Sequence, residues 1–251
     1  MYVVVSEYPK AGGTWLSKML ADVLRLPLPI KPFLPLGFPC VIHNHWVYNP
    51  RFHRPVYLYR DGRDVMVSFF FHRMRALATM QYFGHASDVR KYDRLFGKGY
   101  DPNDARGLLP RFIEHEFAHP HAARLNWRQH AESWMRDKSK GHIGYVSYEA
   151  LRHNTHEELA RLVTHITARE PDSWDIDTAI EKFSMERQTG RKPGDEDTHS
   201  FIRKGIAGDW KNHFTRESGE LFNDLGGDAL VDLGYETDRQ WTSRVSFVDD
   251  R

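Results

Sequence analysis

A lysine and a pair of glycines follow a β-branched apolar run near the start of the chain, in the stretch Tyr8-Pro-Lys-Ala-Gly-Gly-Thr-Trp15. A turn that joins a strand to a helix presents backbone N–H groups and the positive end of the helix, which suits a phosphate or sulfate ligand. Lys10 adds a full positive charge at the same point. The common nucleoside-triphosphate loop has its lysine after the glycines, not before them, and the same turn also fits a purely structural role. The stretch is therefore a candidate anion-binding loop of an uncommon kind.

Another apolar run is followed by an arginine, and a serine lies eight positions after that arginine. Arg60 comes directly after the run 55–59, and Ser68 lies two helical turns into the segment that follows. Ligands of open parallel sheets bind at the carboxyl ends of the strands. A guanidinium and a hydroxyl group together suit one phosphate. Taken alone, Arg60 also fits an ordinary ion pair, for example with Asp64.

Two adjacent cations precede a glycine in the late stretch Arg203-Lys-Gly-Ile-Ala-Gly-Asp-Trp-Lys-Asn212. Main-chain N–H groups of such a turn and two cationic side chains can surround a phosphate dianion. A pair of charges by itself is usually solvated surface, but the ten-residue string is more specific.

Histidine is the natural general base for a hydroxyl acceptor, because its ordinary pKa lies near neutral pH. His43 and His45 share one face of an extended segment. The sequence identifies no carboxylate partner for them, so we expect no metal site. Either residue also fits a packed histidine at the end of a strand.

The elements that must position these groups alternate between strands and helices. Apolar runs typical of buried strands cover 2–6, 40–43, 55–59 and 142–146, and helical spacing covers 14–26, 61–77, 127–136, 155–166, 178–185 and 214–225. This order predicts an α/β fold: one three-layer domain over 1–251 with a central parallel sheet and a P-loop-like strand–loop–helix. The segment 78–126 shows no regular pattern, and we interpret it as a lid or insertion at an acceptor site.

Charge and hydropathy exclude several classes of protein. Lys and Arg total 35 against 34 for Asp and Glu, a formal charge of +1, which argues against a general nucleic-acid or membrane-surface binder. No apolar run approaches the length of a membrane span. The single cysteine, Cys40, permits no internal disulfide and fits a reducing compartment, so we expect a cytoplasmic protein.

The three motifs together resemble the cytosolic-type sulfotransferases that use 3′-phosphoadenosine-5′-phosphosulfate (PAPS). The family's first loop reads Tyr-Pro-Lys-Ser-Gly-Thr-Thr-Trp, its second motif is an arginine with a serine eight positions on, and its late motif is matched at every defined position. The resemblance implies transfer of a sulfuryl group from PAPS to a small-molecule hydroxyl or amine. It implies contacts to the 5′-phosphosulfate from Lys10, Ala11, Gly12, Gly13 and Thr14, to the adenine from Trp15, Tyr148 and Phe183, and to the 3′-phosphate from Arg60, Ser68, Arg203, Lys204 and Gly205.

The family places its general base within Lys-Thr-His, just after a strand. The corresponding stretch here puts His45 at the base and His43 where lysine is usual. We favour His45, and leave His43 as the alternative. The resemblance also implies that Lys10 stabilises the charge on the departing phosphate, and that Ser68 holds Lys10 until an acceptor arrives.

This chain departs from the family at several positions. Ala11 and Gly13 replace a serine and a threonine, which removes two hydroxyl groups. Arg216 replaces a valine of the family's dimer motif, so we expect a monomer or a weak homodimer. Aromatic residues expected to line the acceptor pocket, unless some belong to the core, are Phe69, Phe70, Phe71, Tyr82 and Phe83.

Two other functions compete with this interpretation. A nucleotide kinase would need a glycine-rich loop that ends in Gly-Lys-Ser/Thr, and that loop is absent from the sequence. A catalytically degenerate protein that only binds PAPS, or its desulfonated product PAP, would fit the altered loop and histidine segment. Phenols, steroids, amines, sugars and other alcohols all remain open as acceptors.

Overall fold

The structure is a computed structural model, and it describes residues 2–29, 37–79, 85–120, 123–136 and 141–250. The chain divides into two units, and each is described separately. The first unit holds Met1–Arg60, Ala122–Leu125 and Gln129–Asp195, and the second holds Asp61–His121, Asn126–Arg128 and Glu196–Arg251. The prediction of one domain over 1–251, with 78–126 as a lid or insertion, stays a prediction.

A parallel four-stranded sheet forms the centre of the first unit, in the order β2-β1-β3-β4. Its strands are β1 (Tyr2–Glu7), β2 (Cys40–Asn44), β3 (Val56–Tyr59) and β4 (Gly144–Ser147). The chain passes from β1 to β2 on one side and then returns to β3 on the other side of β1. The strand order therefore reverses between β1 and β3. The carboxyl ends of strands at such a switch point are where open α/β sheets bind their ligands.

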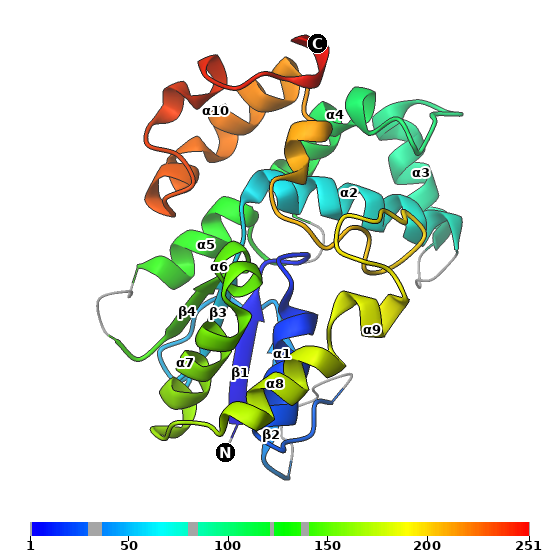
Figure 1. The fold of residues 1–251 in the computed structure, drawn as a ribbon. Helices are drawn as coiled ribbons and strands as arrows, with labels where there is room; N and C mark the ends of the chain where they lie inside the picture. The colour runs from blue at the N-terminus through cyan, green and yellow to red at the C-terminus, as the bar shows by residue number, and fades with distance from the viewer. Residues whose placement is uncertain (1, 30–36, 80–84, 121–122, 137–140, 251) are drawn as a thin grey trace. The chain divides into compact units, whose positions relative to one another are not determined.

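Three helices cover one face of this sheet (Figure 1). They are α1 (Gly13–Val23), α7 (Thr155–Thr167) and α8 (Ser173–Lys182). Alternate strand residues such as Val5 and Leu58 pack in one core with Leu16 of α1 and Leu162 of α7. The two-residue period of a strand and the apolar stripe of a helix produce this arrangement directly.

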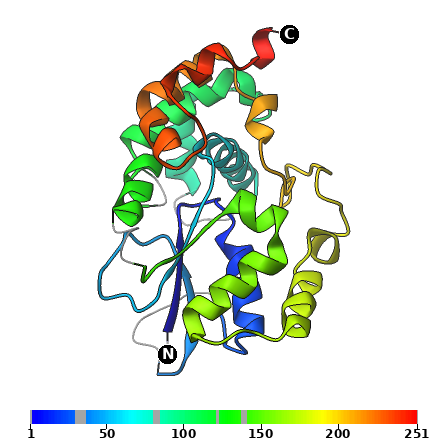
Figure 2. The same ribbon diagram turned by 60° about the vertical axis from the view of Figure 1, so that its left-hand side comes forward.

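The opposite face of the sheet is covered by α5 (Trp127–Met135), which lies across β1 from α1 and α7 in Figure 2. Trp134 of α5 stacks on Tyr57 of β3 with 4.8 Å between the ring centroids. The indole N–H of Trp134 donates to the carbonyl oxygen of Trp46 at 3.0 Å. The sheet therefore has helices on both faces, and the predicted α/β fold with a central parallel sheet is confirmed. Two short helices, α6 (Tyr148–His153) and α9 (Met185–Thr189), complete this unit.

The second unit is helical. It contains α2 (Gly62–Ala78), α3 (His85–Phe96), α4 (Ala105–Ala118) and α10 (Arg216–Asp232), with the 3-10 turns η2 (Asp209–Asn212), η3 (Arg239–Ser243) and η4 (Val248–Asp250). Asp61 caps α2 by accepting from the N–H of Arg63 at 2.9 Å. The carboxylate of Asp64 accepts from the N–H groups of Gly208 at 2.7 Å and Trp210 at 2.9 Å, so α2 fixes the late motif.

The segment 78–126 was predicted to be irregular, and that prediction is wrong, because α3 and α4 lie within it. The apolar stripe of α3 is narrow, with Tyr92 and Phe96 buried among charged neighbours. Pro110 interrupts the helical pattern inside α4. Both features hide a helix from a search for periodicity.

Two further expectations need correction. The helix predicted over 178–185 is two helices, because α8 ends at Lys182 and Ser184 caps α9 by accepting from the N–H of Arg187. Three phenylalanines expected to line the acceptor pocket are buried, at 8% exposure or less, and belong to the core; they are Phe69, Phe70 and Phe71. The two remaining candidates, Tyr82 and Phe83, lie outside the described residues.

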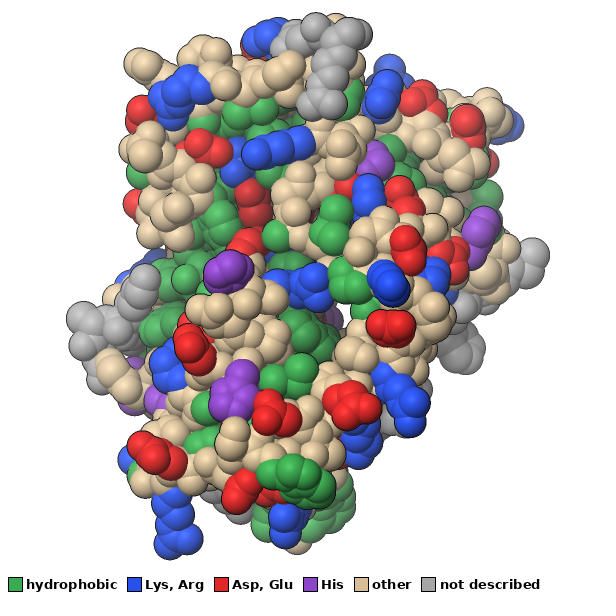
Figure 3. Space-filling model, in the orientation of Figure 1, with side chains coloured by type: hydrophobic (Ala, Val, Ile, Leu, Met, Phe, Trp, Pro, Cys, Tyr) green, Lys and Arg blue, Asp and Glu red, His purple; other side chains and the backbone are tan. Residues whose placement is uncertain are grey.

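Charges of both signs are interspersed on the face shown in Figure 3, in keeping with the balanced composition. Within the described ranges, no helix combines the length and hydropathy that a membrane crossing requires.

Candidate functional site

The candidate anion-binding loop lies between the end of β1 and the start of α1. Lys10 has φ of 74° and Gly12 has φ of 111°, both in the left-handed region. That conformation is available to glycine but costs another residue about 1–2 kcal/mol, so the contacts around the loop must hold Lys10 in it. A Cβ atom on Gly12 would lie 2.8 Å from Cδ2 of Tyr148, so only glycine fits against this ring.

Arg60 lies at the carboxyl end of β3 and is buried. Its Nη1 donates to the carbonyl oxygen of Lys10 at 3.3 Å. Its Cζ lies 4.2 Å from the centroid of the Tyr148 ring, a cation–π distance. The structure thus brings Lys10, Arg60 and Tyr148 together at the switch point of the sheet.

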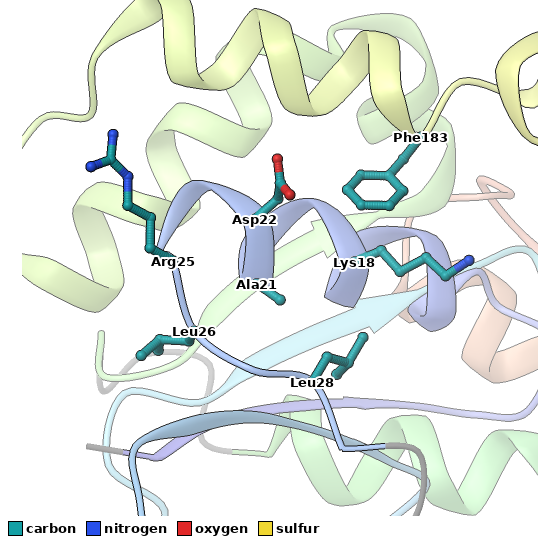
Figure 4. Close-up of a pocket in the computed structure, with 7 residues that line it drawn as sticks. All are labelled: Lys18, Ala21, Asp22, Arg25, Leu26, Leu28 and Phe183. Carbon is teal, nitrogen blue, oxygen red and sulfur yellow. The ribbon is translucent and has the colours of Figure 1, made fainter.

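Two of the three aromatic residues expected at the adenine, Trp15 and Phe183, lie on or directly beside neighbouring helices of the first unit. The ring of Trp15, in α1, meets Tyr148 edge-on with 6.3 Å between centroids. Phe183 directly follows the last residue of α8, and its ring faces the side of α1 that carries Lys18 and Asp22 (Figure 4). An open depression of about 440 Å³ lies there. Both aromatic residues are half-buried and pack against the same core.

A buried carboxylate that the sequence analysis missed lies below the loop. Glu7 ends β1 and is 3% exposed. One oxygen, Oε1, accepts from Nε2 of His43 at 2.9 Å, and the other, Oε2, accepts from the main-chain N–H of Gly13. The main-chain oxygen of Glu7 accepts from Nδ1 of His45 at 3.2 Å. The two-residue alternation of β1 places Glu7 on the same face as Val3 and Val5, but no signal in the sequence pairs it with His43.

The electrostatics assign different states to these groups. Burial acts to raise the pKa of Glu7. The hydrogen bond and the charge of His43 lower this pKa by more than burial raises it, so the net shift is downward. Burial lowers the pKa of His45, and the charge of Glu7 opposes that shift only in part. Because a carbonyl oxygen can only accept, the proton of neutral His45 is on Nδ1, which leaves a lone pair on Nε2. His45 is thus neutral at pH 7 and able to take a proton at Nε2.

The same three side chains are of types that bind divalent metals. Glu7, His43 and His45 offer ligand atoms within 4.8 Å of one another. In the second unit, Glu196, Asp209 and His213 do the same. In both groups these atoms make hydrogen bonds or ion pairs with each other, with neighbouring cations or, for His45, with a main-chain oxygen. The expectation that the protein needs no metal stays a prediction.

The late motif forms a cluster of cations around one buried carboxylate in the second unit. Asp209 is 1% exposed and accepts from Nζ of Lys204 at 2.7 Å, from Nδ2 of Asn212 at 2.9 Å and from Nη2 of Arg203. Arg203 also pairs with Glu196 through Nη1, and Nζ of Lys204 lies 3.7 Å from the same carboxylate.

The neighbouring cations keep the carboxylate of Asp209 ionised. Burial acts to raise the pKa of Asp209, but hydrogen bonds from His213 and Lys204 and the charge of Arg203 hold it far below its usual range. Gly205 and Gly208 adopt φ of 65° and 78°, which turns the main chain around the cluster. Ser68 is half-buried on α2. The sequence identified Arg203, Lys204 and Gly205, but gave no role to Asp209 or Glu196.

Several known proteins are similar to this chain. The family model described as "Sulfotransferase domain" matches residues 40–234. Sulfotransferase 1E1 of Homo sapiens is 24% identical over 266 residues, which cover 88% of this chain and 81% of the human protein. Cytosolic sulfotransferase 1 of Danio rerio is 26% identical over 269 residues, which cover 89% of this chain and 80% of the relative.

Solved structures show the same fold. Mouse sulfotransferase SULT7A1 complexed with PAP has a TM-score of 0.65 at 15% identity, covering 96% of this chain and 87% of the mouse chain. Retinol dehydratase in complex with retinol and PAP has a TM-score of 0.63 at 18% identity, covering 92% of this chain and 81% of that chain.

Proposed function

The chain belongs to the sulfotransferase domain family, and we propose that it transfers a sulfuryl group from PAPS to a hydroxyl or amine of a small-molecule acceptor. One observation carries the proposal. At the switch point of the sheet, the guanidinium of Arg60 is bound to the main chain of a glycine-containing loop and covered by Tyr148. A loop of this kind at a helix N-terminus is suited to the phosphosulfate of a nucleotide.

We assign PAPS contacts from the family resemblance, and within the first unit the grouping of Lys10, Arg60 and Tyr148 supports them. Lys10 and the turn 11–14 bind the 5′-phosphosulfate, while Trp15, Tyr148 and Phe183 contact the adenine. The 3′-phosphate is bound by three cationic residues and two of their neighbours, namely Arg60, Ser68, Arg203, Lys204 and Gly205. A cytoplasmic location and a monomeric or weakly dimeric state accompany this proposal.

In the proposed reaction, one residue of the first unit accepts a proton and another stabilises a negative charge. As the acceptor oxygen or nitrogen bonds to sulfur, its proton passes to Nε2 of His45, and the bond from sulfur to the 5′-phosphate oxygen breaks. Lys10 stabilises the negative charge left on that oxygen, so PAP is the second product. Positioning and charge stabilisation supply most of the rate in group transfers of this type. Ser68 keeps the catalytic role that the family resemblance implies.

The alternative is a protein that binds PAP or PAPS without turnover. One observation favours it: the N–H of Gly13, which an anion-binding loop would offer to its ligand, already donates to Glu7. Turnover of any acceptor would eliminate this alternative.

Calorimetric titration with PAP and with ADP tests the nucleotide assignment. We expect tight binding of PAP and weak binding of ADP, because ADP lacks the 3′-phosphate. Equal affinity for the two would contradict the proposal.

His45→Ala tests the base, with His53→Ala as the control, since His53 is an exposed histidine of the same unit. His45→Ala should abolish turnover with PAP affinity nearly unchanged, and His53→Ala should change neither. Weak PAP binding with normal turnover in His45→Ala would sink the assignment of the base.

A further inference from the structure

Glu7 makes three contacts with three different segments of the first unit. Its carboxylate receives the N–H of Gly13 at the start of α1 and Nε2 of His43 at the end of β2. Its main-chain oxygen receives Nδ1 of His45 just beyond that strand. Glu7 itself is almost fully buried, so these contacts are shielded from water and screened little by salt.

Gly13 is the residue that leaves room for this arrangement. A Cβ atom at position 13 would lie 2.5 Å from Cδ of Glu7 and 2.6 Å from Nε2 of His43. Side-chain atoms do not approach so closely, so any residue other than glycine must displace both the carboxylate and the imidazole. The sequence resemblance places a threonine at position 13 and a lysine at position 43. These two departures therefore have one physical cause, which is the carboxylate of Glu7.

We propose that Glu7 is a positioning residue: its carboxylate holds the phosphate loop and His43 in register beside His45, and Gly13 and His43 are the residues that this carboxylate requires. The inference rests on the proposed function in so far as His45 is the general base. Glu7 acts through other residues, because its carboxylate faces Gly13 and His43.

The charge of Glu7 also acts on the base. Among the residues that the structure describes, the titratable groups besides Glu7 that act on His45 are His43, Lys10 and His130. Burial lowers the pKa of His45, and Glu7 raises it, while His43 and Lys10 lower it further. Glu7 is thus the one negative charge among these groups, and it moves the pKa of His45 back toward the ordinary value of histidine.

A double-mutant cycle tests the coupling between positions 7 and 13. Gly13→Ala should lower the Tm and weaken PAP binding by about tenfold. Adding Glu7→Thr should recover fivefold or more of the lost PAP affinity, because residues in contact couple by such amounts. Gly37→Ala is the matched control, since a Cβ there meets nothing within 4 Å, and its effect should add to that of Glu7→Thr.

Glu7→Gln separates charge from shape. The amide can rebuild both hydrogen bonds once His43 changes tautomer, so PAP affinity should stay within about threefold. The acid limb of the pH profile of kcat/KM should move to lower pH by roughly half a unit or more, because a negative charge within 4.8 Å of the imidazole is lost. A merely structural Glu7 would leave that limb in place.

The two proposals fail in different ways. The Tm cycle needs no nucleotide, so it reports on Glu7 and Gly13 even if the unmodified protein binds no PAP, a result that would sink the proposed function alone. Additive Tm changes, or an unmoved acid limb in Glu7→Gln, would overturn the present inference. If Gly13→Ala yields no folded protein, recovery of folded protein in Glu7→Thr/Gly13→Ala supports the coupling. Failure of that double variant, when Glu7→Thr alone folds, contradicts it.

Discussion

Replacing Glu196 with glutamine should strengthen the binding of PAP. The carboxylate of Glu196 pairs with Arg203 and lies 3.7 Å from Nζ of Lys204, the two cations assigned to the 3′-phosphate. A phosphate that approaches these cations must therefore displace Glu196 or tolerate its charge. Glu196→Gln removes the competing charge and retains the shape of the side chain.

The size of the effect follows from exposure. The side chain of Glu196 is 34% exposed, whereas those of Arg203 and Lys204 are 10% and 18% exposed. An ion pair with one partner this exposed is screened by water and contributes roughly 0.5–1 kcal/mol. Its loss should lower the Kd for PAP by about two- to fivefold. ADP lacks the 3′-phosphate, so its affinity should not change.

Calorimetry at two salt concentrations measures this difference. The gain for PAP should shrink at high salt, because ions screen an exposed pair. Glu220→Gln is the control: it removes an equal charge from an exposed position on α10 and should leave the Kd unchanged. Unchanged or weaker PAP binding by Glu196→Gln would refute the reasoning, and so would an equal gain for ADP.

Four further predictions concern stability, pH and metal removal. Asp209→Asn should lower the free energy of unfolding by about 3–5 kcal/mol, because it removes the buried counter-charge of Arg203 and Lys204; an unchanged Tm would contradict this. The folded-state pKa of Asp209 lies below its ordinary value of 3.8, so its contribution is present above that pH and is lost as the pH falls toward the folded pKa. The Tm of the unmodified protein should therefore fall more steeply than that of Asp209→Asn between roughly pH 5 and pH 2. The acid limb of kcat/KM should lie below pH 6.5, because burial lowers the pKa of His45, and a limb at higher pH would count against that residue as the base. Dialysis against EDTA should leave turnover unchanged, since in the proposed reaction Lys10 supplies the charge that a metal would supply; activity lost and then restored by zinc would show otherwise.

The fold was predictable because its signals are local. The strand β1 and the helix α7 repeat their apolar residues with clear periods, and the structure confirms both within one residue at each end. The helix α3 was missed because only Tyr92 and Phe96 mark its buried side. Tertiary packing, not local pattern, decides the structure of such a segment.

The site was predictable where motifs are contiguous in sequence and unpredictable where partners meet only in the fold. Lys10 and Gly12 come from one short string, so their shared loop could be inferred directly. Glu7 and His43 are 36 residues apart and meet because β1 and β2 are adjacent parallel strands. A carboxylate at the end of an apolar strand has no sequence signature that names its partner.

Three carboxylates near the proposed nucleotide contacts have two different roles, and the extent of their burial distinguishes these roles. Glu7 and Asp209 are 3% and 1% exposed and each receives several donors, so they are fixed parts of their clusters and set geometry. Glu196 is exposed enough to move aside, so we expect it to compete with a bound phosphate and to influence the affinity for PAP. Substitutions should therefore divide accordingly: Glu196→Gln changes the Kd for PAP with little effect on Tm or kcat, whereas Asp209→Asn changes Tm first. A Glu196→Gln variant that altered only Tm would show that Glu196 is structural, and that the phosphate binds without displacing it.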